Sequence, residues 1–144
     1  MKVNTTIGIF ALLTALCVAL PARAENSSQI RRLLETGECS GCNLAGVNLS
    51  GVQLLGADLR NANLQGANLS GSNLEGADLT GANLKNADLT DTFLTNASLD
   101  YAIMTDANLT NARVYNANTS GAVLTGVNIQ NAEVFGSGIN VGGE

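Results

Sequence analysis

Residues 57–91 read ADLRN-ANLQG-ANLSG-SNLEG-ADLTG-ANLKN-ADLTD, seven consecutive units of five residues. On either side of this stretch, a leucine recurs at every fifth position from Leu44 to Leu99, and 19 of the 20 unit centres from residue 44 to residue 139 are apolar, with Thr119 as the exception. A small residue usually lies two positions before each centre, and Gly, Asn or Asp lies two positions after it in 18 of the 20 units. Such internal repetition is typical of solenoid architectures.

A period of five residues excludes an amphipathic α-helix. Each step of five residues rotates the side chain by about 140° around a helix, so the leucines would form no apolar stripe. In an extended backbone, residues two apart point to the same side, so the small residue and the leucine face one interior while the residues between them face solvent. Gly, Asn and Asp tolerate a left-handed backbone and suit a corner. The repeat therefore predicts a chain that winds into a coil with a leucine-lined interior.

The unit Ala62-Asn63-Leu64-Gln65-Gly66 resembles that of the pentapeptide repeat family, in which Ala, Asp or Asn, and Leu precede two variable positions. The resemblance covers residues 42–141 and leaves a C-terminal tail at 142–144. It implies an all-β fold, a right-handed quadrilateral parallel β-helix (β-solenoid) with four pentapeptides per coil. The 20 units would then make about five coils. The arrangement of a helix, two cysteines and then repeats is similar to that of exported cyanobacterial members.

Residues 1–24 have the pattern of a secretory signal peptide. Lys2 precedes an apolar stretch from Ile7 to Leu20, and Ala22-Arg23-Ala24 is an Ala-x-Ala cleavage signal. The stretch is shorter than the roughly 20 residues of a membrane span. We therefore expect cleavage after Ala24, no membrane anchor afterwards, and export to the periplasm, or to the thylakoid lumen if the source is a cyanobacterium.

Residues 25–41 are expected to form a capping helix and a linker. Ile30, Leu33 and Leu34 lie at helical spacing on one face, with Ser28 as the N-cap and Gly37 as the C-cap. A helix over the first coil would cover the open strand edges there, which could otherwise pair with another chain.

The motif Cys39-Ser40-Gly41-Cys42 is the first candidate for chemistry. A zinc site would need two further ligands, but the mature chain has no other cysteine and the sequence has no histidine. Reactive thiols favour a helix N-terminus, whereas Cys39 follows the expected helix C-terminus. A disulfide that fastens helix to coil is the preferred interpretation for an exported chain, with two packed thiols as the alternative.

Composition excludes several other functions. Without histidine there is no Ser/His or Cys/His pair, and aromatic residues make up only 3% of the chain, which leaves little to stack on bases or sugars. Asp58 and Asp78 are four units apart, so they should lie one above the other in a column of the coil, with Asp100 nearby on the same face. This face is convex and has no cleft, and the repeat itself favours Asp or Asn at that position. We expect no catalytic residue, no cofactor and no metal.

Departures from the repeat at outward positions indicate candidate contact surfaces. Their members are apolar or aromatic residues of the C-terminal half: Ile103 stacked with Val123 beside the corner residue Tyr101, and on the opposite face Tyr115 stacked with Phe135 near Phe93. Exposed apolar clusters mark interaction sites. Decay of the repeat is the alternative explanation.

Three functions follow from these observations. The first is an exported, non-enzymatic protein-interaction or scaffold module, with an unknown protein partner, no nucleic acid, and self-association through the C-terminal coil. The alternative, implied by the family resemblance, is DNA mimicry that binds a type II topoisomerase. The signal segment and a moderate net charge of −7 after cleavage, from 5 basic and 12 acidic residues, disfavour it. An enzyme or metal-binding protein is the third and is disfavoured because no catalytic constellation is present.

Overall fold

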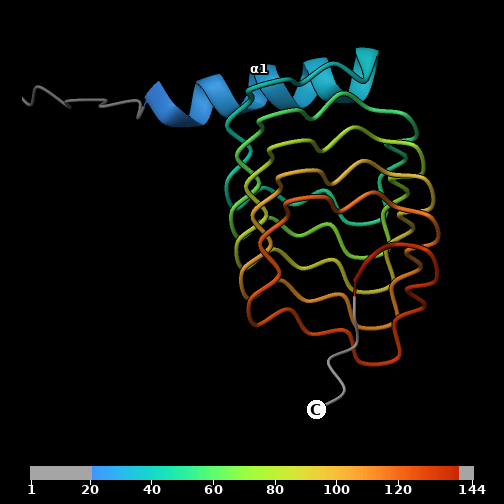
Figure 1. Ribbon diagram of the computed structural model, residues 1–144. Coiled ribbons are helices and arrows are strands. Elements are labelled where there is room, and N and C mark those ends of the chain that lie inside the picture. The colour runs from blue at the N-terminus through green and yellow to red at the C-terminus, as the bar shows by residue number, and fades with distance from the viewer. Residues whose placement is uncertain (1–20, 140–144) are drawn as a thin grey trace, which may run out of the picture.

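The computed structural model describes residues 21–139, and the side chains of residues 26–139 (Figure 1). Within residues 21–139, one helix, α1 (Pro21–Thr36), precedes a coil of stacked turns. The expected apolar signal segment, Ile7–Leu20, and the C-terminal tail at 142–144 lie outside the described residues. Within residues 21–139, no helix is both long and apolar enough to cross a membrane.

Parallel pairing fixes the register of the coil. Sixteen bridges join residues that are 20 apart, from Glu38 with Asp58 to Arg113 with Glu133. Each turn therefore contains four pentapeptides and presents four outer faces. In the described part of the chain the pairs are isolated bridges that do not merge into longer strands. Pairing starts at Glu38, one unit before the first leucine centre, because Cys39 occupies the inward position of a leucine.

The hydrogen bonds of one unit explain why Asn or Asp precedes each leucine. In Asn63–Ala67, three backbone N–H groups donate to adjacent turns, and that of Ala67 donates to the carbonyl of Leu64 across the corner at 3.0 Å. The remaining N–H, that of Gln65, donates to the side-chain Oδ1 of Asn63 at 3.2 Å. The same hydrogen bond, from a backbone N–H to the side chain two residues earlier, recurs along the coil from Ala45 to Gln130. The Asn or Asp thus satisfies the one backbone donor that neither the ladder nor the corner uses.

Each corner is a turn whose third residue has positive φ. Gly66 lies there at φ 63°, and Asn61 occupies the previous corner at φ 56°. A positive φ at this position is typical of type II turns, which favour Gly or Asn. Among the described residues, nine non-glycine residues have positive φ, and all are Asn or Asp except Tyr101.

The interior is filled by the side chains of the chain itself. Every centre from Leu44 to Val114 is at most 3% exposed. Three inward polar residues, Ser72, Thr92 and Ser137, are also buried, and Thr92 Oγ1 donates to the carbonyl of Leu69 at 3.0 Å. In the last described turn, the centres Leu124, Ile129 and Val134 are only half-buried, whereas Ile139 is buried. The predicted leucine-lined interior is confirmed.

Helix α1 lies across the N-terminal end of the coil (Figure 1). Leu33 is buried and Ile30 packs against the core, but Leu34 is 53% exposed, so the expected inward face was one residue too wide. Gly37 ends the helix with φ 74°, and its N–H donates to the carbonyl of Leu33 at 2.9 Å, as predicted for a C-cap.

The predicted N-cap at Ser28 is wrong. The helix already begins at Pro21, and Ser28 lies within it. Proline is favoured at the first helical position and the alanines that follow have high helix propensity, so the helix starts earlier than the apolar spacing indicates.

Candidate interaction surface

Cys39 and Cys42 are joined by a disulfide at the junction of helix and coil. Both are buried, and the Cys42 N–H donates to the Cys39 carbonyl at 3.1 Å, so the bond spans the first corner. From α1, Arg32 donates through Nη2 to Cys42 Sγ at 3.0 Å and through Nε to the Glu38 carbonyl at 2.9 Å. Gln29 Oε1 accepts the N–H of Asn43 at 2.7 Å. The helix is thus attached to the coil by polar contacts as well as by Leu33.

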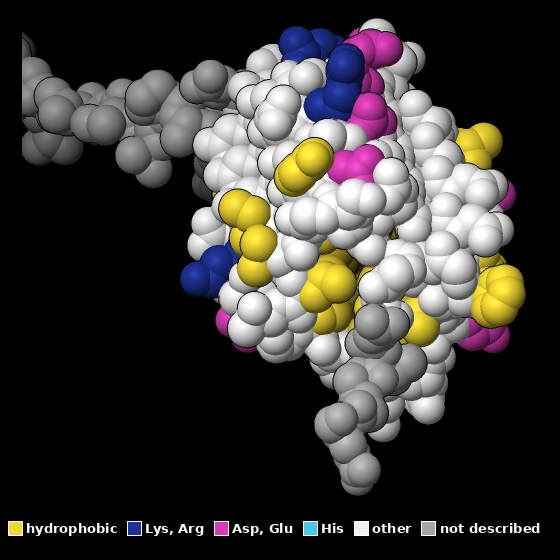
Figure 2. Space-filling model, viewed as in Figure 1, with side chains coloured by type: hydrophobic (Ala, Val, Ile, Leu, Met, Phe, Trp, Pro, Cys, Tyr) yellow, Lys and Arg dark blue, Asp and Glu magenta, His cyan; other side chains and the backbone are white. Residues whose placement is uncertain are grey.

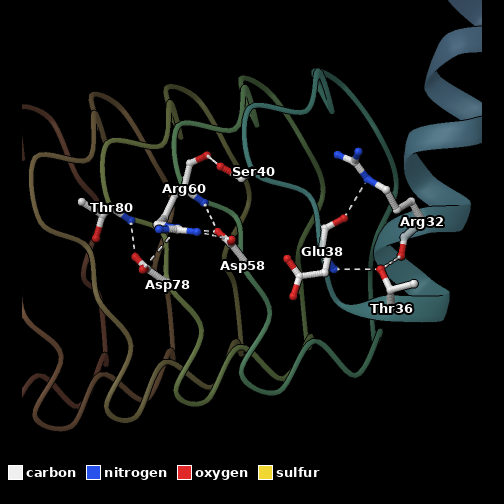
Figure 3. A network of polar contacts seen from close by, with 8 residues as sticks. All are labelled: Arg32, Thr36, Glu38, Ser40, Asp58, Arg60, Asp78 and Thr80. Atoms are coloured by element: carbon white, nitrogen blue, oxygen red, sulfur yellow. Dashed lines mark hydrogen bonds and ion pairs between the residues drawn. The ribbon is translucent and has the colours of Figure 1, made fainter.

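Asp58 and Asp78 both lie beside one arginine, Arg60 (Figure 3). Arg60 donates to Asp58 through Nη2 at 2.6 Å and through Nε at 2.8 Å, and its Nε lies 3.7 Å from Asp78 Oδ2. The side-chain hydrogen bonds from Arg60 hold the pKa of Asp58 at about 2 and, reciprocally, raise the pKa of Arg60. Asp100 instead accepts from Asn118 Nδ2 at 2.8 Å. These carboxylates are therefore in contact with hydrogen-bond donors of the same face.

Tyr101, Ile103 and Val123 form an exposed cluster, which we call the Tyr101 patch. Ile103 and Val123 lie one above the other on adjacent turns of the same face, as predicted. They are 41% and 43% exposed. Tyr101 occupies the adjoining corner at φ 57° and is 69% exposed. Its ring lies against the next turn, because a Cβ added to Gly121 would lie 2.7 Å from two ring carbons.

The aromatic residues of the opposite face lie in a separate cluster with partners of their own. Arg113 stacks over Phe93, with Cζ 5.1 Å from the ring centroid, and its Nε lies 3.8 Å from Glu133 Oε2. The Tyr115 hydroxyl donates to the same Glu133 carboxylate, which raises the pKa of Tyr115. Phe135 is 78% exposed near the C-terminal end of the coil, where self-association stays a prediction.

Two exposed apolar residues were missed by the sequence reasoning. Leu55 is 66% exposed and Leu34 is 53% exposed. Leu55 follows a centre leucine in the variable part of its unit, so its position in the register already places it on the outer surface. Figure 2 shows further hydrophobic side chains over the C-terminal half of the coil on the face in view, with several charged side chains near the end that carries α1.

Within residues 26–139, no group of three or more His, Cys, Asp or Glu side chains is arranged to hold a metal ion. A hollow near the C-terminal end is lined by small and polar residues, Ala117–Ser120 and Gly136–Gly138, and none of these titrates. Because the interior is occupied by leucine and alanine, a partner can be bound only on the outer faces or at an end of the coil.

Comparisons with known proteins agree with this architecture. The family model for pentapeptide repeats matches eight copies over residues 38–76, 77–114 and 102–137. The crystal structure of a pentapeptide repeat protein, Rfr23 from the cyanobacterium Cyanothece 51142, is similar at 36% identity with a TM-score of 0.63, covering 76% of this chain and 92% of that one. Comparison with curated proteins gives no match.

Two further solved structures are similar. AT2G44920, a pentapeptide repeat protein from the Arabidopsis thaliana thylakoid lumen, is 30% identical with a TM-score of 0.49, covering 72% of this chain and 69% of that one. QnrB1, a plasmid-mediated fluoroquinolone resistance protein, is 20% identical with a TM-score of 0.59, covering 62% of this chain and 45% of that one, and this likeness concerns the fold alone.

Pentapeptide repeat proteins fold as right-handed quadrilateral β-helices, which is the fold class expected from the resemblance. The family match extends over more than half of the chain and follows the same five-residue register as the bridges. This chain belongs to the family of pentapeptide repeat proteins.

Proposed function

We propose that this chain is an exported, non-enzymatic module that binds a protein partner on the outer faces of its coil. The filled interior carries this proposal: from Leu44 to Val114 the inward centres are at most 3% exposed, which leaves no internal space for a substrate. The outer faces are flat and regular because their side chains repeat at every turn. Binding surfaces of repeat proteins arise in the same way.

The charged groups on these faces support binding rather than catalysis. Asp58 and Arg60 have pKa values shifted by each other, and Tyr115 has a pKa raised by Glu133. Each of these shifts arises from a surface hydrogen bond, not from a desolvated cleft of the kind that tunes a general acid or base.

In this proposal the rod has about five coils, and α1 covers its N-terminal end. The helix buries Leu33 over the first turn and contacts Asn43 and Cys42 by hydrogen bonds. A covered end cannot add strands from another chain, so lateral faces remain for specific contacts. The segment before Glu25 supports export to the periplasm or thylakoid lumen.

Crosslinking in the native host tests this function. A photo-crosslinkable residue is placed at Thr125 or at Gln130, which are exposed on different faces. We expect one defined protein to be crosslinked from at least one position, and the recovered chain to begin at Glu25. Absence of any crosslinked protein at both positions would contradict the binding function, and a chain that begins at Met1 would contradict export.

A further inference from the structure

We propose that the Tyr101 patch docks a protein segment that carries an apolar side chain next to a lysine or arginine. This inference rests on the proposed function, because it identifies where a partner is held and what chemistry the partner has. It is carried by three observations: the backbone conformation of Tyr101, the residues that Ile103 and Val123 replace, and the charges at the border of the patch.

Tyr101 is in an unfavourable conformation for its side chain. Among the described residues, its column of corners otherwise contains Gly and Asn, namely Gly41, Asn61, Gly81 and Gly121. A left-handed backbone is unfavourable by about 1 kcal/mol or more for a bulky residue. Burial of apolar surface offsets little of this free-energy cost, because Tyr101 is 69% exposed. An outlier that the fold does not need is a candidate for function.

Ile103 and Val123 also replace residues that stabilise the coil. In the three preceding turns, the residue at the same position of this column is asparagine. One of these, Asn83, accepts the backbone N–H of Lys85 through its Oδ1 at 3.1 Å. The aliphatic side chains of Ile103 and Val123 have no acceptor atom and give up this bond. Three adjacent positions therefore exchange a stabilising residue for an exposed apolar one.

Two aromatic residues of the opposite face, Phe93 and Tyr115, are different, because their partners lie within the chain. Phe93 is covered by Arg113, and Tyr115 donates to Glu133. The Tyr101 ring lies against Gly121 on one side, and the residue is 69% exposed. Tyrosine is enriched at binding hot spots because it combines a large apolar area with few rotatable bonds.

Acidic side chains border the patch. Asp100 directly precedes Tyr101, and Asp106 occupies the next corner of the same turn at φ 57° and is exposed. One turn earlier on this face lies Lys85. Asp100 and Asp106 lie on either side of the apolar residues, and the whole chain has a net charge of −5. A partner that places a basic residue beside its docking side chain would therefore have the charge that complements this surface.

The columns themselves supply variants that separate binding from folding. Tyr101→Gly introduces the residue found at Gly81 and Gly121, and Ile103→Asn with Val123→Asn extends the column of asparagines. We expect the triple variant to be at least as stable as the wild type, because each change restores the repeat. Any loss of binding would then arise from the surface and not from unfolding.

A random peptide library displayed on phage is the probe. Selection on the wild-type chain should enrich peptides with an apolar side chain next to Lys or Arg, and these should bind the triple variant at least tenfold more weakly. Asp106→Asn keeps a residue suited to the corner and should weaken binding severalfold, with a smaller effect at high salt. Peptides that bind the triple variant equally well, peptides without a basic residue, or no enrichment over the triple variant would each overturn the inference.

Phe135→Gln is the matched control, because Phe135 is the most exposed aromatic side chain of the described residues and lies on the opposite face. It should leave peptide binding unchanged, and an equal loss would indicate nonspecific hydrophobic adhesion and overturn the inference. The proposed function fails separately: if the wild type and the triple variant crosslink the same protein equally in the host, the function stands and the docking site is wrong.

Discussion

The ring of Tyr101 rests on Gly121, one turn further along the coil, so that a Cβ at Gly121 would lie 2.7 Å from two ring carbons. Both residues are corners of the same column, at φ 57° and φ 69°. The glycine thus provides the left-handed backbone of its own turn and also the space that the tyrosine ring occupies.

Gly121→Ala should destabilise the protein through both effects. The positive φ alone should lower the free energy of unfolding by about 1 kcal/mol, and displacement of the Tyr101 ring should add up to about 1 kcal/mol. Gly51→Ala is the matched control, with φ 68° and no atom within 4 Å of the added Cβ. Urea denaturation measures both. If the two variants are equally stable, or if Tyr101→Gly fails to remove the difference, the ring does not constrain Gly121.

Ile103→Asn and Val123→Asn should each stabilise the coil. The new Oδ1 would accept the backbone N–H two residues later, as Asn83 does for Lys85 at 3.1 Å. We expect a gain of about 0.5–1.5 kcal/mol in the free energy of unfolding for each change. The urea midpoint at constant slope checks this. A lower midpoint would mean that contact between the two aliphatic side chains is worth more than the hydrogen bond.

Asp58→Asn should remove a pH dependence of stability at low pH. The pKa of Asp58 is lowered to about 2 by Arg60, so its ionised form stabilises the fold above the ordinary carboxyl pKa near 3.8. That stability is lost as the pH falls through the region between these values. The backbone N–H of Arg60 donates to Asp58 Oδ1 at 3.1 Å. Asparagine at position 58 keeps this acceptor oxygen but cannot ionise. Thermal unfolding of wild type and variant should therefore converge towards pH 2, and a constant difference from pH 5 to pH 2 would contradict the ion pair.

Glu133→Gln should lower the pKa of Tyr115 towards its ordinary value. The Tyr115 hydroxyl donates to Glu133, which stabilises the protonated phenol, and the carboxylate charge adds to the effect. Titration of tyrosinate absorbance in a Tyr101→Gly background reports on Tyr115 alone, since the chain has two tyrosines. Linkage requires that this contact stabilises the fold below the ordinary tyrosine pKa and that the stability is lost as the pH rises above it. An unchanged titration in Glu133→Gln would show that the hydrogen bond does not form in solution.

The intact mass of the exported chain should be two hydrogens lighter than that of the reduced chain, because Cys39 and Cys42 are bonded. Because the bond leaves neither sulfur as a free thiol, labelling of the denatured chain without reductant should also fail. Cys39→Ser is the control, since it leaves Cys42 unpaired and open to labelling after denaturation. An unchanged mass upon reduction would restore the alternative of two packed thiols.

Much of the candidate site could be predicted because the spacing of the repeat fixes which residues lie next to one another. Once four units form a turn, residues 20 apart must be neighbours, which places Ile103 beside Val123 and Asp58 beside Asp78. The pattern does not contain the side-chain conformations, so it does not show which contacts neighbouring side chains make. That Arg113 covers Phe93 and reaches Glu133 depends on side-chain conformations, which a five-residue period leaves open.

The sequence by itself determined the coil, its interior and its corners. A leucine at every fifth position can be buried only in a winding chain, and Gly or Asn at the corner permits the left-handed turn. Only the tertiary structure decided that Leu34 is exposed and that the Tyr101 ring lies on Gly121. The physical reason is that the repeat period fixes which residues lie above one another, whereas the exposure and the conformation of a side chain depend on the packing around it.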